Sequence, residues 1–577
     1  MCRKTIIFAQ KFKLCAMNTY RNFNSYIESS IISNWHLDAL TDYKGITLQY
    51  HDVARKIEKL HILFENSGLK KGDKIGLCGR NSAHWAVAFF ATLTYGAVAV
   101  PIQNEFKPEQ IYNIVNHSEA KLLFVGDFVA KEIDPAQMPG LEGIINIPDY
   151  SLMLSRTDDL TYAREHLNEI FGRRFPRCFR AEDVHYHEAE AEELAIINYT
   201  SGTTGFSKGV MLPYRAIWGN LDFCIDVLGD KFPAGSNILS ILPMAHMYGM
   251  MVEFIFPFVH GCHLFFLTRL PSPAIIAQAF SEVKPAVVIS VPLVVDKIIR
   301  KYIFPRIQNN KVKLLWNMPV INKKVKERIC QIVMEVFGGN AYEVMTGGAA
   351  LNQEIEKFLK SIDFPITSGY GATECAPLIT YSDWKDFIPG SCGTPVKHME
   401  VKILSPDPEN IPGEIVARGV NVMLGYYKNP ESTMEVLDKD GWFNTGDVGH
   451  IDKDGYLYLT GRAKSVIVTE GGKNVFPEEL EDKFQLYGEI EQISIIPYIG
   501  DKETKSEIIR AVVYPNPQLL KEKGMDETSK IISGIVEEVN RDLQSYKKIT
   551  LVTVTDEPLP TTSTRKIKRF EVMKKFN

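Results

Sequence analysis

A loop rich in glycine and hydroxyl side chains lies near the middle of the chain, at residues 199–210. It follows the apolar run 194–197, which has the length and composition of a buried strand. Glycine lets the backbone approach an anion closely, and hydroxyl groups and a lysine donate hydrogen bonds. A polyphosphate needs such donors, so we predict a phosphate-binding loop, with a glycine-rich surface turn as the alternative. The candidate residues are Thr200, Ser201, Gly202, Thr203, Thr204, Gly205 and Lys208.

The loop is not a Walker loop, because that motif ends in Gly-Lys-Ser/Thr and Lys208 lies between Ser207 and Gly209. It resembles the phosphate-binding signature of the adenylate-forming superfamily, which comprises acyl-CoA synthetases, adenylation domains and luciferases. The resemblance runs from about residue 45 to the C-terminus and includes five motifs in the family's order.

The composition limits the class of protein. The chain has 577 residues, too many for one ordinary domain, and 45% of them are hydrophobic, enough for several cores. Its net charge of −5 argues against a nucleic-acid-binding protein. The nine cysteines show no CxxC spacing, which favours reduced thiols in a cytoplasmic protein over a disulfide framework or a zinc site. Residues 1–16 make a poor signal peptide and are interpreted as an extension or a misassigned start.

Predicted strands and helices alternate in the first third of the chain, which indicates βαβ units and a largely parallel sheet. The strands are expected at 47–50, 74–78 and 97–101, and the helices at 53–64 and 81–92. Residues 150–190 are charged and are expected to form an irregular surface insertion, and residues 393–460 are predicted to form short strands and turns.

The resemblance implies an α/β fold with two domains. The large N-terminal domain would have parallel-type sheets flanked by helices and a small β-barrel subdomain, and a small mobile α+β domain would follow it. We predict an uncertain extension at 1–16, an adenylation domain at 17–463 and a small domain at 464–577, with a hinge at Lys464.

Two segments bear on membrane contact. Residues 249–267 are strongly apolar, but Glu253 and Pro257 interrupt them, so we predict a buried helix followed by a strand and no transmembrane helix. Residues 297–328 are basic, which is typical of a solvated helical face. The alternative is a docking patch for anionic lipid at the inner face of a membrane.

Two further segments resemble the family's adenine-binding region. Glycine and alanine leave room for a flat group, Tyr370 offers a ring for stacking, and Glu374 offers oxygen atoms for Mg²⁺. The resemblance implies that Thr203 also contacts the metal ion and that His246 lines the path of the carboxylate substrate, with a packing histidine as the alternative. The nucleotide-binding candidates here are Gly348, Ala349, Gly369, Tyr370, Gly371 and Thr373.

The last motifs lie in the C-terminal quarter. The block 440–464 resembles the fatty-acyl-CoA synthetase signature, in which Asp447 would accept the ribose hydroxyls and Arg462 would contact nucleotide oxygens. Gly471 and Gly472 resemble the loop that lines the CoA tunnel. Lys566 matches the family's catalytic lysine, although Arg565 replaces the usual glycine before it.

Together these motifs predict an ATP-dependent ligase that activates a medium- or long-chain fatty acid as an acyl adenylate and transfers it to CoA, with Mg²⁺. No aspartate for a substrate ammonium lies between Pro243 and Leu267, which favours an apolar acid. A ligase that loads acyl carrier protein and a catalytically inactive relative that binds acyl groups or nucleotide remain alternatives. The sequence leaves the oligomeric state open.

Overall fold

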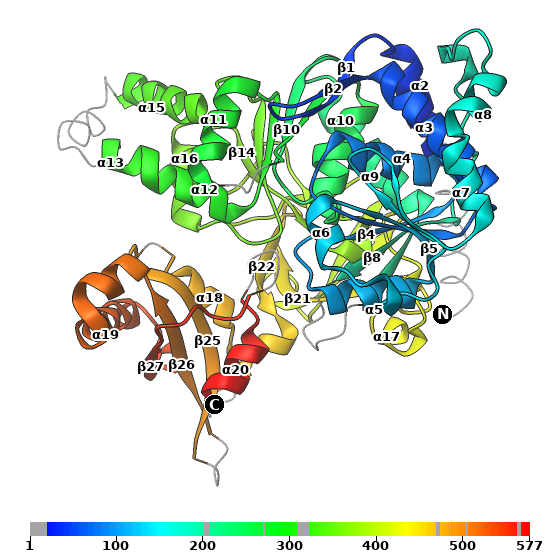
Figure 1. Ribbon diagram of the computed structural model, residues 1–577. Helices are drawn as coiled ribbons and strands as arrows, with labels where there is room; N and C mark the ends of the chain where they lie inside the picture. The colour runs from blue at the N-terminus through cyan, green and yellow to red at the C-terminus, as the bar shows by residue number, and fades with distance from the viewer. Residues whose placement is uncertain are drawn as a thin grey trace, which may run out of the picture. The chain divides into compact units, whose positions relative to one another are not determined.

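The computed structural model describes residues 20–200, 208–268, 272–307, 322–468, 473–485, 487–501, 506–561 and 567–577 (Figure 1). Its Cα positions divide the described residues into two compact units. The first unit contains the chain up to Thr200 together with 208–401 and 417–443. The second contains 402–416 and 444–577. The predicted boundary at Lys464 stays a prediction.

An eight-stranded sheet forms the centre of the first unit, in the order β20-β9-β8-β4-β3-β5-β6-β7. Its inner strands run parallel, and β7, β9 and β20 add antiparallel pairs at the two ends. This confirms the predicted α/β class. The strands are β3 (Lys74–Cys78), β4 (Val98–Ile102), β5 (Ala120–Val125), β6 (Gly143–Asn146), β7 (Leu152–Ser155), β8 (Leu194–Thr200), β9 (Lys208–Pro213) and β20 (Gly425–Tyr426).

Helices cover both faces of this sheet. Successive strand residues point to opposite sides, so each face supplies side chains that pack against its own helices. Leu123 and Val125 of β5 join a core cluster with Ile111 of α5. Phe124, between them, faces the other side and packs edge-on against Phe64 of α3, with ring centroids 6.3 Å apart. The helices of this region are α3 (Tyr50–Asn66), α4 (Ala83–Tyr95), α5 (Pro108–Ser118), α6 (Asp127–Glu132), α9 (Tyr214–Leu228) and α17 (Pro430–Val436).

The prediction of an irregular insertion at 150–190 was wrong, because the structure has two helices there, α7 (Asp158–Glu165) and α8 (Leu167–Arg174). The Thr157 side chain accepts the N–H of Leu160 and begins α7. Leu160 and Ala163 then form a buried stripe on an otherwise charged helix. The charged composition concealed this narrow apolar face.

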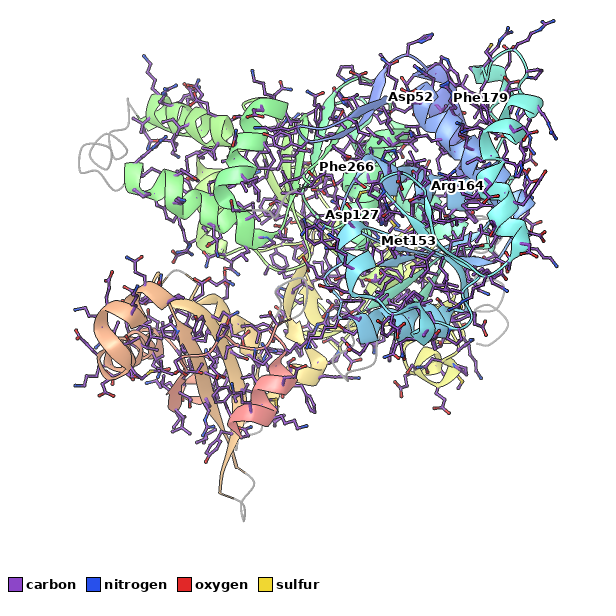
Figure 2. The ribbon with its side chains drawn as sticks, viewed as in Figure 1. Asp52, Asp127, Met153, Arg164, Phe179 and Phe266 are labelled. Carbon is purple, nitrogen blue, oxygen red and sulfur yellow. The ribbon has the colours of Figure 1, made fainter. Side chains whose placement is uncertain are left out.

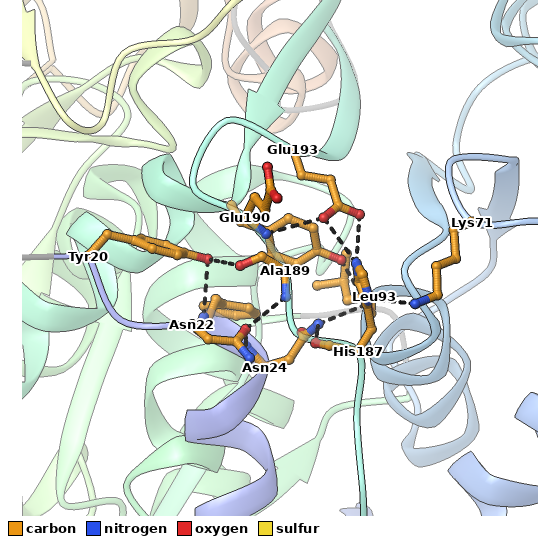
Figure 3. A network of polar contacts seen from close by, with 11 residues as sticks. Tyr20, Asn22, Asn24, Lys71, Leu93, His187, Ala189, Glu190 and Glu193 are labelled. Carbon is orange, nitrogen blue, oxygen red and sulfur yellow. Dashed lines mark hydrogen bonds and ion pairs between the residues drawn. The ribbon is translucent and has the colours of Figure 1, made fainter. Parts of the chain in front are cut away.

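The helix α2 (Phe23–Ser33) is tied to the segment that leads into β8 (Figure 3). The Asn24 side chain donates to the carbonyl oxygens of His187 at 2.9 Å and Leu93 at 3.2 Å. The His187 ring lies 2.8 Å from the Glu193 carboxylate, and Glu193 directly precedes the strand. This polar network fixes the entry to β8 and therefore the start of the predicted phosphate-binding loop.

Two further sheets complete the larger part of the first unit, in the orders β10-β11-β1-β2 and β12-β13-β14. Phe266 of β11 lies in the interior, whereas Asp52 and Phe179 lie toward the periphery (Figure 2). The strands are β1 (Asp38–Asp42), β2 (Thr47–Gln49), β10 (Asn237–Ser240), β11 (His263–Phe266), β12 (Val287–Ser290), β13 (Glu343–Thr346) and β14 (Ile366–Ser368). The helices are α11 (Pro273–Val283), α12 (Pro292–Ile298), α13 (Phe304–Ile307), α15 (Asn322–Val336) and α16 (Gln353–Ser361).

The apolar stretch 249–267 is a buried helix followed by a strand, as predicted. It consists of a π-helix (Gly249–Ile255), α10 (Phe256–Val259) and β11. Within the described ranges, the chain has no helix whose length and apolar character would let it cross a membrane.

Residues 393–460 form short strands and turns as predicted, together with one helix that was not predicted, α17. These strands belong to two sheets, β15-β16-β17, whose first two strands precede residue 393, and β18-β19-β21-β22. They are β15 (Tyr370–Gly371), β16 (Leu378–Tyr381), β17 (Thr394–Pro395), β18 (Met399–Leu404), β19 (Gly413–Gly419), β21 (Phe443–Ile451) and β22 (Leu457–Arg462).

The rest of the second unit has its own core and an α+β architecture. The sheet β25-β26-β27 packs against α19 through Ile532, Ile535 and Val536. The elements are β23 (Ile467–Val468), β24 (Asn474–Val475), α18 (Pro477–Asp482), β25 (Ile490–Asp501), β26 (Ser506–Pro515), α19 (Pro517–Arg541), β27 (Leu551–Val554) and α20 (Arg569–Phe576).

Candidate active site

The predicted phosphate-binding loop joins two paired strands, β8 and β9. Thr200 lies opposite Lys208, and Tyr199 lies opposite Gly209. A Cβ at Gly209 would lie 2.9 Å from Ile197 Cγ2 and 3.0 Å from the Tyr199 ring, so a larger residue here would force these side chains to shift. The two ends of the loop are therefore held side by side. The predicted residues Ser201, Gly202, Thr203, Thr204 and Gly205 lie outside the described residues.

The structure brings Lys208 and Glu374 together through one tyrosine. Tyr426 of β20 donates its hydroxyl to Glu374 Oε1 at 2.9 Å, and Lys208 Nζ lies over the same ring, 4.8 Å from its centroid. Burial, reinforced by the Glu374 carboxylate, raises the pKa of Tyr426 well above its usual range. Tyr426 therefore stays a neutral donor that orients the carboxylate.

The backbone around Glu374 is fixed by its neighbours. Gly371 passes so close to Pro377 that a side chain would lie 2.1 Å from the Pro377 carbonyl oxygen. The buried Asn220 of α9 donates to the carbonyl of Cys375 at 3.1 Å and accepts the N–H of Leu378 at 2.9 Å. Thr373, another predicted nucleotide-binding residue, begins the short 3₁₀ helix Thr373–Cys375 that carries Glu374.

The two predicted adenine-binding segments lie next to each other. The N–H of Gly369 donates to the carbonyl of Thr346 at 3.0 Å, and the hydroxyls of Thr346 and Ser368 are 2.7 Å apart. Ser368 in turn donates to the buried carboxylate of Glu356 at 3.1 Å. Gly348 has a φ of +83° and open space where a side chain would be. A flat group has room beside Gly348 and Ala349.

Tyr370, proposed as the stacking ring, is only 7% exposed and begins β15. It lies opposite Thr380 of β16. Its position directly after Gly369 keeps it within the adenine-side segment. Stacking on an adenine remains a prediction.

The segment that carries His246 is held against the adenine side. Asn198 of β8 donates to the carbonyl of Ala245 at 3.0 Å, which links this segment to the strand that precedes the phosphate loop. The N–H of Tyr248 points at His246 Nδ1 at 3.4 Å. The Tyr248 ring packs tightly on Gly347, where an added Cβ would lie 3.0 Å from the ring. The His246 segment is therefore linked on one side to β8 and on the other to the adenine segment at Gly347.

Sequence reasoning missed two buried carboxyl groups that support these segments. Glu253 accepts the N–H groups of Ile241 at 3.1 Å and Leu242 at 2.9 Å, and its other oxygen has no hydrogen-bond partner among the described residues. Glu343 accepts the Tyr381 hydroxyl at 2.7 Å and the N–H of Trp384 at 2.8 Å. Burial raises the pKa of Glu253 well above its usual value and that of Glu343 to about 8. The sequence signal that could have identified Glu253 is its position as a single acidic residue within the apolar stretch 249–267.

The second unit holds the remaining described candidates. Asp447 of β21 lies opposite Arg462 of β22, and Arg462 Nε is 3.0 Å from Asp447 Oδ1. Lys464 is exposed in the 3₁₀ helix Ala463–Ser465. Asp447 and Arg462, the two residues predicted to bind the nucleotide, therefore contact each other. Gly471, Gly472 and Lys566 lie outside the described residues.

A magnesium ion fits the donor set of the first unit. Across the described ranges, no group of three or more His, Cys, Asp or Glu side chains is arranged to hold a metal ion. Mg²⁺ bound together with a nucleotide needs only one or two carboxylates, because phosphate oxygens and water complete its shell. The half-buried carboxylate of Glu374 meets that requirement.

Comparison with known proteins agrees with this geometry. The AMP-binding enzyme family matches residues 34–427. The Homo sapiens long-chain-fatty-acid–CoA ligase ACSBG2 is 28% identical over 479 residues, which cover 79% of this chain and 70% of that protein. A long-chain-fatty-acid–CoA ligase of Escherichia coli is 26% identical over 554 residues, covering 90% of this chain and 89% of that protein.

Two solved structures share the fold along most of the chain. The anthranilate CoA ligase AuaEII in complex with anthranoyl-AMP has a TM-score of 0.77 at 20% identity and covers 96% of this chain and 97% of its own. The Mycobacterium tuberculosis fatty acyl CoA synthetase has a TM-score of 0.63 at 21% identity and covers 96% of this chain and 98% of its own.

Proposed function

The chain belongs to the AMP-binding enzyme family, and from this premise we propose that it is an adenylate-forming ligase that joins a medium- or long-chain fatty acid to CoA. The observation that carries the proposal is the cluster of Lys208, Tyr426 and Glu374 at the foot of the β8–β9 loop. It combines a cation for phosphate oxygens with a carboxylate for a metal ion, beside two segments that leave room for a flat base.

In the first half-reaction an oxygen of the fatty-acid carboxylate attacks the α-phosphorus of ATP. The bond from that phosphorus to the bridging oxygen breaks, and pyrophosphate leaves. Negative charge grows on the phosphoryl oxygens, so the step depends on positioned donors and cations. Lys208 and the loop donors would hold the β- and γ-phosphates, and Lys566 would bridge the carboxylate and the α-phosphate.

Glu374 and Thr203 would hold Mg²⁺, which would supply charge neutralisation for the leaving pyrophosphate. Tyr426 keeps the Glu374 carboxylate aimed by donating to one of its oxygens at 2.9 Å. Asp447 would accept the ribose hydroxyls, and Arg462 would contact nucleotide oxygens. His246 would line the path by which the acid reaches the α-phosphate.

In the second half-reaction the CoA thiol attacks the acyl carbon, and AMP leaves. The nucleophile comes with CoA, so no cysteine of this chain is needed. Gly471 and Gly472 would let the slender pantetheine arm approach. Lys464 would be the pivot about which the small domain turns between the two steps. A Lys464→Pro variant should keep adenylation and lose thioester formation. Equal loss of both steps would count against the pivot.

The apolar acid is supported by the buried segment 249–267 and by the names of the relatives. The long-chain-fatty-acid–CoA ligases of Homo sapiens and Escherichia coli share 28% and 26% of their aligned residues with this chain. The anthranilate ligase with a similar fold shows that the same architecture also hosts other acids. The proposal therefore covers both medium-chain and long-chain fatty acids.

The test is acid-dependent release of AMP and pyrophosphate from ATP, with CoA present or absent. The acids would run from acetate through octanoate and palmitate to 4-coumarate and several amino acids. We expect AMP with octanoate or palmitate and thioester only when CoA is added. Replacing CoA with acyl carrier protein separates the carrier-protein ligase, and ATP binding without AMP from any acid would instead support the inactive relative.

Contact with an anionic membrane face by an otherwise cytoplasmic enzyme is a second part of the proposal. Within the basic stretch, α13 and α15 form an apolar groove of about 270 Å³ rimmed by Arg306, Lys324 and Arg328. Apolar contact flanked by cations suits an anionic lipid surface. Co-sedimentation with phosphatidylserine-containing vesicles but not with neutral vesicles would support it, and equal partition would remove it.

A further inference from the structure

An asparagine of the first unit joins the central sheet to the segment that carries His246. Asn81 lies in the turn between β3 and α4. Its Nδ2 donates to the carbonyl of Leu242 at 2.6 Å, and its Oδ1 accepts the N–H of Met244 at 2.9 Å. Nδ2 also donates to Ser240 Oγ at 3.2 Å. A single amide group therefore holds a segment that lies 159 to 163 positions further along the chain.

The held segment depends on side chains because its backbone follows no regular structure. Residues 241–246 belong to no helix or strand, and buried backbone groups need hydrogen-bond partners. Glu253 accepts two N–H groups at the start of this segment, and Asn198 donates to the carbonyl of Ala245 near its end. Asn81 supplies a donor and an acceptor between them. The three side chains thus hold this backbone from three different elements.

Asn81 also lies at the edge of the sheet where a ligand is expected. The strands β3, β4 and β8 run parallel, so their carboxyl ends meet at one edge. Asn81 follows the carboxyl end of β3, and Thr200 is the last residue of β8, where the predicted phosphate-binding loop begins. In open α/β sheets, ligands bind beside the carboxyl ends of the strands. Asn81 therefore ties the His246 segment to the edge that carries the predicted phosphate-binding loop.

We propose that Asn81 is a positioning residue for His246 and, through it, for the carboxylate end of the acid substrate. His246 lies two residues after Met244, and its N–H donates to the carbonyl of Pro243 at 3.0 Å, within the held segment. Loss of the Asn81 amide would release Leu242 and Met244 and let the histidine ring move. This role rests on the proposed function, in which His246 lines the path of the acid.

The two substrates of adenylation give the inference a selective signature. A displacement of about 1 Å near the reacting groups can cost on the order of 100-fold in rate. The proposed ATP contacts of Lys208 and Glu374 belong to other elements, β9 and the 3₁₀ helix Thr373–Cys375. Displacing His246 should therefore impair use of the acid more than binding of ATP. A loss confined to the acid separates positioning from a general weakening of the unit.

The experiment compares Asn81→Leu with the wild-type full chain and with Asn66→Leu. Asn66 is a half-buried asparagine at the end of α3, and its amide donates to the carbonyl of Ile62 at 2.7 Å. The histidine ring is followed by NMR in a chain labelled with isotope-enriched histidine, and the His246 signal is assigned by its loss in His246→Gln. Adenylation is measured as pyrophosphate exchange into ATP, with the acid that supports the fastest exchange in the wild-type chain.

We expect Asn81→Leu to shift the His246 signal and to lower kcat/KM for the acid about 10- to 30-fold, while the KM for ATP changes less than about twofold. Asn66→Leu should change none of these quantities. Asn81→Asp is a milder variant of the same shape, which keeps an acceptor for the N–H of Met244 and loses the donor to Leu242. It should lower kcat/KM for the acid about 3- to 10-fold, again without a matching change for ATP.

An unmoved His246 signal in both Asn81 variants would overturn the positioning role. So would a shifted signal with unchanged kcat/KM for the acid, or equal losses for the acid and for ATP. If the wild-type chain exchanges no pyrophosphate with any acid, the proposed function fails, and the role of Asn81 toward the acid fails with it. The His246 signal still reports in that case whether Asn81 holds the ring, so the two failures are distinguishable.

Discussion

The two units anchor their functional segments in different ways. In the first, buried carboxyl groups receive hydrogen bonds from uncharged donors: Glu253 from backbone N–H groups, Glu343 from Tyr381 and a backbone N–H, and Glu356 from Ser368. In the second, the anchors are ion pairs. Arg569 holds Glu478 and Glu481, Lys547 holds Glu479, and Arg462 holds Asp447.

This difference separates a fixed scaffold from ion pairs, of which the Arg462–Asp447 pair is exposed enough to exchange its partners. Hydrogen bonds from buried neutral donors are short-ranged and hold one geometry, and salt does not screen them. Ion pairs at half-exposed positions can change partners at little cost. Asp447 and Arg462 illustrate the second case, because both are predicted to contact the nucleotide and here contact each other. Nucleotide binding would exchange this pair for new ones.

The sharpest test of the fixed scaffold is Glu374→Gln. If the first unit is built before substrate binds, the change should affect chemistry and leave stability alone. We expect AMP release at saturating ATP and Mg²⁺ to fall by about 10²- to 10³-fold, because a charged metal ligand is lost. The melting temperature should stay within about 2 °C of wild type.

Tyr426→Phe is the matched control for that variant. It keeps the ring under Lys208 and removes only the hydroxyl that aims Glu374. Its AMP release should fall by about 3- to 10-fold. A larger loss in Tyr426→Phe than in Glu374→Gln would contradict the assignment of Glu374 as the metal ligand and of Tyr426 as the residue that orients it.

Glu253→Leu tests whether a buried acceptor holds the His246 segment. Leucine has a similar volume but leaves the N–H groups of Ile241 and Leu242 without an acceptor. We expect a loss of about 2–4 kcal/mol in the free energy of unfolding of the first unit, measured by urea titration. Glu253→Gln keeps an acceptor oxygen and should cost less than about 1 kcal/mol. A leucine variant as stable as wild type would show that the carboxyl anchors nothing.

The pH dependence of stability compares the two units directly. Glu343 has a folded-state pKa of about 8, above the usual value near 4.3 for an unfolded chain. Between these values the folded state binds more protons, so the stability from Glu343 is full below the unfolded pKa and is lost as pH rises toward 8. Glu343→Gln does not titrate, so its stability relative to wild type should improve by roughly 3.5 kcal/mol from pH 5 to pH 8.

Chemical denaturation at pH 5, 6, 7 and 8 checks this slope. The corresponding variant in the second unit, Glu481→Gln, should show the same sign but stop improving near pH 7, where the raised pKa of Glu481 lies. Parallel pH profiles for Glu343→Gln and wild type would rule out a protonated Glu343 in the folded state.

The smallest effect is expected at the exposed ion pair. Arg462 is 57% exposed, so Arg462→Gln should change the free energy of unfolding by less than about 1 kcal/mol. Raising NaCl from 0.05 to 0.5 M should reduce even that difference. The same variant should raise the KM for ATP, which thermal unfolding alone would not report. A large stability loss would place this pair among the fixed anchors and break the comparison.

The sequence predicted the parts of the fold that depend on local pattern. The strand 74–78 and the helix that begins near residue 81 were predictable, because apolar spacing and the Ser82 cap are local signals. The helix α7 was missed, because only two apolar residues mark its buried side. The motifs also located Lys208 and Glu374 without showing how they meet.

The missing part of the site is long-range. Tyr426 reaches Glu374 only because β20 pairs with β9, and nothing near Tyr426 in the sequence announces that pairing. Asn220 supports Cys375 across 155 positions of the chain. Such contacts follow from tertiary packing, which overrides local propensity. The roles of the motif residues in catalysis stay predictions.

The geometry of the π-helix Gly249–Ile255 depends on the number of residues in this segment. A π-helix holds its residues with i→i+5 hydrogen bonds and is rare compared with the α-helix. Deleting one residue before Glu253 would let the segment wind as an α-helix and would rotate the carboxyl by about 100°. The helix would gain local stability, while Ile241 and Leu242 would lose their acceptor. A redesign of this segment can therefore vary its side chains but has to preserve the number of residues.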